Sequence, residues 1–160
     1  MSTRSLTIAV LGFAAVLGLG ASGEMVLALD PRLFPPEATA IPFIAAHQTS
    51  WALRSWMLGS NLLNLSCAVT FASAALAIRR GQAHGWRRLR LAAAVLGSIA
   101  LVGVPVCLGY LLPLPSGPAE SESRFLLFSV VAASLGLATI CAFLLRHATN
   151  ALIRSPQAGG

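Results

Sequence analysis

The fold is decided by the stretch HQTSWALRSWMLGSNLLNLSCAVTFASAALAI (residues 47–78), in which a polar beginning runs into a long apolar segment. Its residues 52–78 are long enough for a helix that crosses a bilayer, which needs about 20 apolar residues. On that helix, residues three or four positions apart share one face. One such face brings polar side chains into the membrane, and its members are His47, Trp51, Arg54, Leu58, Asn61 and Leu65.

The composition of the whole chain is that of a protein surrounded mostly by lipid. Of its 160 residues, 56% are hydrophobic and only 10% are charged, and the mean hydropathy of +0.78 exceeds that of ordinary soluble domains. Besides residues 52–78, three runs are long enough to cross a bilayer: Leu6–Leu29, Leu91–Leu112 and Phe125–Leu145. We therefore predict a single all-α domain, an integral membrane bundle of four antiparallel helices.

The first of these runs also resembles a secretory signal peptide. A basic start, the apolar run Leu6–Gly20 and the small residues Ala21–Gly23 have the required order, and cleavage would leave three spans. We favour a retained helix, because the apolar character resumes at Met25–Leu29 and no Ala-x-Ala motif precedes a suitable cleavage point. Small residues on a retained helix allow close contact with a neighbour; they are Ala14, Gly18, Gly20 and Gly23.

Prolines end the first span and shape the connection that follows it. Asp30–Pro31 and Pro35–Pro36 stop the helix, because proline lacks the N–H of a continuing ladder and restricts the residue before it. We interpret residues 30–51 as the first outer loop. Within it, Ile41–Ala46 is too short to span and is expected at the membrane interface. The tail, residues 155–160, is predicted to be disordered.

The arginines set the predicted orientation. All eleven basic residues are arginine, and with four spans eight of them fall on one side and three on the other. Because the side with eight arginines should face inward, the positive-inside rule predicts cytoplasmic termini in a bacterial inner membrane. All five acidic residues lie in the outer connections or the outer half of a span. No basic face is interleaved with aromatic residues, so the net charge of +6 does not indicate nucleic acid. We expect lipid head groups to contact Arg79, Arg80, Arg87, Arg88 and Arg90.

Polar residues near the outer ends of the spans form a candidate pocket. Glu24 lies in the outer third of the first span, where an unpaired charge is costly, and Arg54 is its most suitable partner. The pocket that we predict opens toward the outer leaflet. The alternative is an ion pair and amide hydrogen bonds that only stabilise the bundle. The candidate residues are Glu24, His47, Arg54, Asn61, Asn64 and Tyr110.

The motifs of well-known enzymes are not found in this sequence. No zinc-ligand spacing, nucleophile elbow or phosphate-binding glycine loop is present, and the three histidines lie at span ends, which disfavours haem ligation. The sequence assigns no metal and no cofactor. We predict an accessory or partner-binding subunit of a membrane complex, with the lipid bilayer and another membrane protein or a second copy as partners. The alternative is a small membrane enzyme or carrier for a lipophilic substrate, with Glu24, His47 and Arg54 as proton donor, acceptor and anion clamp.

Overall fold

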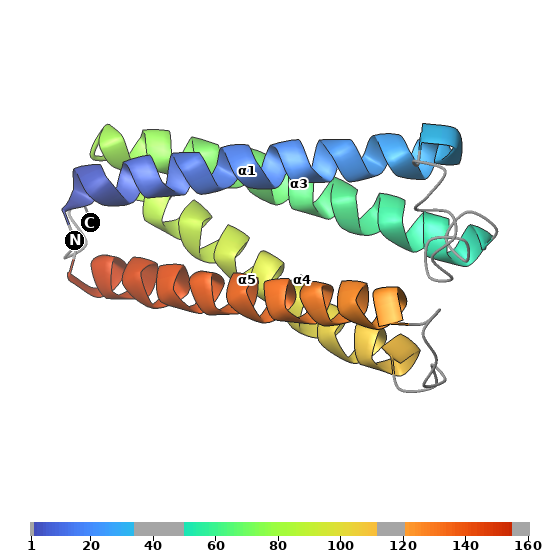
Figure 1. The fold of residues 1–160 in the computed structure, drawn as a ribbon. Helices are drawn as coiled ribbons and strands as arrows, with labels where there is room; N and C mark the ends of the chain where they lie inside the picture. Colours follow the sequence, from blue (N-terminus) through green and yellow to red (C-terminus); the bar gives the residue numbers. More distant parts are fainter. Residues whose placement is uncertain (1, 34–49, 112–120, 155–160) are drawn as a thin grey trace.

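The protein is an all-α bundle of four long apolar helices. The computed structural model describes residues 2–33, 50–111 and 121–154. Each long helix is apolar enough, over at least 18 residues, to cross a membrane. The predicted fold, a four-span membrane helical bundle, is confirmed. The helices, shown in Figure 1, are α1 (Thr3–Leu29), α3 (Trp51–Arg79), α4 (His84–Leu111) and α5 (Ser121–Arg154), and a 3₁₀ turn, η1 (Pro31–Leu33), follows α1.

The helices extend beyond the predicted spans where local contacts support them. The Ser2 side chain caps α1 by accepting a hydrogen bond from the Ser5 backbone N–H at 3.2 Å. At the other end of the chain, α5 continues nine residues past Leu145, because Ala148 is fully buried against the core. The interfacial segment predicted at Ile41–Ala46, the last residue of the third predicted span and the tail 155–160 lie outside the described residues.

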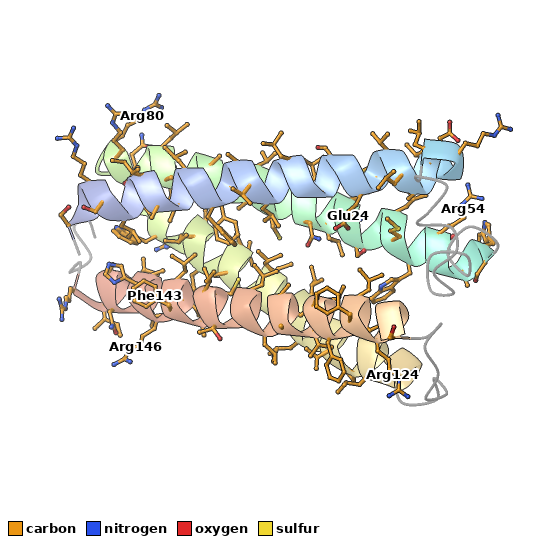
Figure 2. All side chains as sticks on the ribbon, in the orientation of Figure 1. Glu24, Arg54, Arg80, Arg124, Phe143 and Arg146 are labelled. Carbon is orange, nitrogen blue, oxygen red and sulfur yellow. The ribbon has the colours of Figure 1, made fainter. Side chains whose placement is uncertain are left out.

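The four helices pack in the order of the sequence. α1 packs on α3, α3 on α4, and α4 on α5, each antiparallel to the one before. The start of α1, the turn between α3 and α4, and the end of α5 therefore meet at one end of the bundle (Figure 1). We call it the basic end, because Arg80 and Arg146 lie there, whereas Arg54 and Arg124 lie toward the opposite end (Figure 2).

The core is concentrated toward the basic end. Its centre is Phe71, which is fully buried and meets the Phe13 ring edge-on at a centroid distance of 5.3 Å. Small side chains bring the helices together, since a Cβ at Gly97 would lie 3.1 Å from that of Cys141. Toward the opposite end α3 and α4 diverge (Figure 1). The fully buried residues of the core include Leu6, Phe71, Ala74, Ala75, Leu89, Leu96, Cys141 and Ala148.

A tight turn at the basic end joins α3 to α4. Gly81 has a φ of 73°, and the N–H groups of Gly81 and Gln82 donate to the carbonyls of Ile78 and Ala77 at 3.0 Å each. This is a Schellman ending, which satisfies the last carbonyls of α3 and favours glycine at the left-handed position. Gly85 then passes so close to α3 that a Cβ there would lie 2.8 Å from the Ile78 backbone nitrogen.

Candidate functional site

Arg54 and Glu24, the predicted ion pair, lie at different depths in the bundle. Arg54 is half-buried, and its Nη2 lies 3.5 Å from the Ala28 carbonyl oxygen, one turn beyond Glu24 on α1. Within the part of the chain that the structure describes, the two side chains form no ion pair. In Figure 2, Arg54 lies closer than Glu24 to the end of the bundle that is opposite the basic end. Their functional pairing stays a prediction.

Glu24 lies on the same side of α1 as the residues that, closer to the basic end, pack into the core. Val10, Leu17 and Glu24 follow one another at intervals of seven residues and so share one side of the helix. Val10 is buried and Leu17 packs against the core, whereas Glu24 is exposed. Glu24 stands five residues before the end of α1, about 8 Å along the helix axis, and so remains within the apolar span. This carboxylate thus faces the region where the bundle opens.

Asn61 and Glu24 lie at about the same depth. A Cβ at Gly18 would lie 3.6 Å from that of Ala68, which fixes the register of the antiparallel pair α1–α3. Glu24 is six residues beyond Gly18, and Asn61 is seven residues before Ala68. Asn61 is 2% exposed, and its Nδ2 donates to the Met57 carbonyl at 3.0 Å. Its amide is therefore held by its own helix.

Asn64 has an unsatisfied acceptor. Its Oδ1 is buried, and no described residue donates a hydrogen bond to it. Asn64 lies seven residues before Phe71 and fourteen before Ile78, so it continues on α3 the row of side chains that forms the core. A buried acceptor without a donor costs about 1–3 kcal/mol. On both α1 and α3, the side chains that follow the core-facing side of the helix therefore become polar toward the end opposite the basic end.

The remaining two candidates cannot be placed in this site. His47 lies outside the described residues, and for Tyr110 the structure describes the backbone of α4 and not the side chain. The structure therefore places Glu24, Asn61 and Asn64 at similar depths on α1 and α3, with Arg54 about two turns beyond Asn61 toward the end opposite the basic end. A pocket that includes all six candidates stays a prediction.

Sequence reasoning missed a groove between α3 and α4. It has a volume of about 400 Å³ and lies where these helices begin to diverge. Ser60 keeps its hydroxyl on its own helix, donating to the Met57 carbonyl at 3.1 Å. The sequence does contain a signal for this groove, namely the small and hydroxyl residues on the side of α3 that faces α4. The lining residues are Ser55, Trp56, Gly59, Ser60, Leu63, Ser98, Ile99 and Val102.

The arginines predicted to contact lipid are exposed at the basic end. The group Arg79, Arg80, Arg87, Arg88 and Arg90 follows the end of α3 and the start of α4, and the structure exposes each of them. Among the described residues, no group of three or more histidine, cysteine or acidic side chains is arranged to hold a metal ion. No family model matches the chain, and no curated protein or solved structure is significantly similar to it.

Proposed function

We propose that this small polytopic membrane protein is a partner-binding subunit, which uses the Glu24 side of α1 to hold a helix of a different membrane protein. The observation that carries the proposal is the exposed carboxylate of Glu24 within the apolar span of α1, which has no ion-pair partner among the described residues. At a similar depth on α3, Asn64 has a buried Oδ1 without a donor among the described residues. Polar groups inside a span are costly unless they are paired, and interhelical hydrogen bonds are a common way to pair them.

Two glycines make room for such a helix beside Glu24. A Cβ added at Gly20 or Gly23 would meet nothing within 4 Å, so neither glycine is used for packing within the described bundle. Gly18, in contrast, is used internally, since a Cβ there would contact Ala68. The glycine-based packing expected for the first span is thus divided between an inner contact and an open face. Small residues on an open face allow another helix backbone to approach closely.

The chemistry of the open face selects the kind of partner. The carboxylate of Glu24 accepts hydrogen bonds, so the partner helix should present a donor, such as a hydroxyl, amide, imidazole or cationic side chain. A second copy of this chain fits less well. A twofold contact through this face would bring the two Glu24 carboxylates toward each other. An acyl chain has no donor to offer.

Photo-crosslinking in the native membrane tests the partner. With benzoylphenylalanine at Gly20, we expect a crosslink to one defined membrane protein, because Gly20 is open and one turn from Glu24. Changing Glu24→Leu should weaken the crosslink by about tenfold, since an intramembrane hydrogen bond is worth about 1–2 kcal/mol. The product is identified by mass spectrometry.

Two controls accompany this experiment. The same probe at Gly136, an open position on α5, should not capture that protein. Ser22→Leu, on another exposed side of α1, should leave the Gly20 crosslink unchanged, because the Ser22 hydroxyl only donates to the Gly18 carbonyl of its own helix at 2.8 Å. Absence of a protein crosslink at Gly20, or a crosslink indifferent to Glu24→Leu, would contradict the proposal.

A second candidate function is the binding or chemical conversion of a lipophilic molecule, and the α3–α4 groove favours it. Its volume of about 400 Å³ falls in the range of small-molecule sites, and its lining combines apolar side chains with three serines. Here the serines of the lining would bind a polar group of the molecule. Organic extraction of the purified protein distinguishes the two functions. A stoichiometric lipophilic compound together with no Gly20 crosslink would favour this second candidate.

We also propose that the basic end faces the cytoplasm, because it holds eight of the eleven arginines. Reporters fused after Arg80 and after Gly160 are expected to indicate a cytoplasmic location. A reporter fused after Gly117 is expected to indicate an external location. Alkaline phosphatase and green fluorescent protein fusions provide the two readouts. An external location of the Arg80 fusion would refute this orientation.

A further inference from the structure

A second hollow lies at the basic end, between the first turns of α1 and the last turn of α3. Its volume is about 500 Å³. Two arginines from different helices border it, Arg4 from α1 and Arg79 from α3, and both are exposed. The rest of the lining consists of two threonines and two apolar side chains, namely Thr3, Thr7, Ile8 and Leu11.

The lining changes from charged to apolar along the helix axis. Arg4 is the second residue of α1 and Arg79 is the last residue of α3, so both guanidinium groups belong to the end of the bundle. Leu11 lies seven residues beyond Arg4, about 10 Å deeper along the axis. Thr7 is buried between the two levels, and its hydroxyl donates to the Thr3 carbonyl at 2.9 Å. The arginines therefore supply the charged donors of the pocket.

The positive charge of this pocket is not balanced within the bundle. In the described part of the chain, neither Arg4 nor Arg79 forms an ion pair with a carboxylate. Glu24 is twenty residues from Arg4 on the same helix, which separates them by about 30 Å. The other four acidic residues are Asp30, Glu37, Glu120 and Glu122, and the chain places them after α1, before α5 or at its start. Because no described carboxylate pairs with Arg4 or Arg79, both guanidinium groups can pair with an anion from outside the chain.

We propose that this pocket binds one anionic phospholipid, with its phosphate between Arg4 and Arg79 and an acyl chain along Ile8 and Leu11. The pocket and a phospholipid have the same arrangement along the membrane normal. Each has its charge at the membrane surface and its apolar part beneath. Basic pockets between membrane helices bind acidic head groups in this way. The site shares Arg79 with the group of arginines expected to contact lipid around the α3–α4 turn, adds Arg4 from α1 to it, and does not depend on the proposed protein partner.

Native mass spectrometry of the full chain tests this site. The protein is taken from nanodiscs that contain equal amounts of phosphatidylglycerol and phosphatidylcholine. We expect one phosphatidylglycerol to be retained in preference to phosphatidylcholine. The double variant Arg4→Gln, Arg79→Gln should lower that retention at least about tenfold, because it removes both charged donors. The pair Arg4→Lys, Arg79→Lys keeps the charge and should retain most of the lipid.

The control removes the same charge elsewhere at this end of the bundle. Arg87→Gln with Arg88→Gln, both exposed at the start of α4, should leave retention within about twofold of the unmodified chain. Ile8→Ser should weaken retention of the lipid, and added inorganic phosphate should not displace it, because phosphate alone does not use the apolar part of the pocket. Equal losses in the two double-glutamine variants would overturn the proposal, as would retention without head-group preference or displacement by phosphate.

Discussion

Replacing Gly85 by alanine is expected to lower the free energy of unfolding by about 2–3 kcal/mol, the cost of overpacking a site that cannot relax. The added Cβ would lie 2.8 Å from the Ile78 backbone nitrogen, 2.9 Å from Ile78 Cγ1 and 3.0 Å from the Ala74 carbonyl oxygen. Two of these three atoms belong to the backbone of α3, so a change of rotamer does not relieve the contact. The Schellman hydrogen bonds of Gly81 and Gln82 hold the two helices at this distance.

Titration with sodium dodecyl sulfate, followed by the fluorescence of the half-buried Trp86 and the other tryptophans, measures the loss. Gly136→Ala is the matched control. That glycine lies in the middle of α5 with nothing within 4 Å of the added carbon, and alanine has the higher helix propensity. We expect the control to be as stable as the unmodified chain or slightly more stable. Equal stability of the two variants would contradict the close packing of Gly85 against the backbone of α3.

The second large effect is expected at Phe71, where replacement by alanine should cost about 3 kcal/mol, the lower end of the range for a buried phenylalanine. The ring is fully buried at the centre of the core and makes an edge-on contact with Phe13. Since lipid is as apolar as the core, most of this loss comes from lost dispersion contacts and the cavity left behind.

Phe128→Ala removes the same atoms from a lipid-facing position, because Phe128 on α5 is 59% exposed. Its free energy of unfolding should change by no more than about 0.5 kcal/mol, as for most surface positions. Both variants are compared in the same detergent titration. Equal losses would mean that the region around Phe71 is no better packed than the surface.

The sequence was sufficient for the fold because lipid simplifies the problem. Backbone groups inside a bilayer must be satisfied within the chain, so four apolar runs of sufficient length leave few alternatives to four helices. Consecutive spans cross the bilayer in opposite directions, which makes neighbouring helices antiparallel. Finer features do not follow from hydropathy. The extension of α5 to Arg154 depends on the burial of Ala148 against other helices, which no single run of sequence reveals.

The candidate site was predictable only in part. Helical periodicity places Asn61 and Arg54 near one another on α3, and the depth of Glu24 follows from its place in the first run. The relative register of α1 and α3 does not follow, because it depends on close contacts such as that of Gly18 with Ala68. Register decides that Glu24 lies level with Asn61 and that Arg54 reaches the Ala28 carbonyl instead. The pocket proposed to bind a phospholipid depends on the same register, since its lining includes Arg4 of α1 and Arg79 of α3.

The sequential packing of the helices has a consequence for biosynthesis. Each long helix packs mainly on helices that are adjacent to it in the chain, so no span must wait for a distant part of the chain before it finds a neighbour. Contacts that are close in sequence form fast and leave little apolar surface unpaired during folding. The bundle is therefore suited to assemble in the order of synthesis, one helix at a time, as the chain leaves the ribosome and enters the membrane.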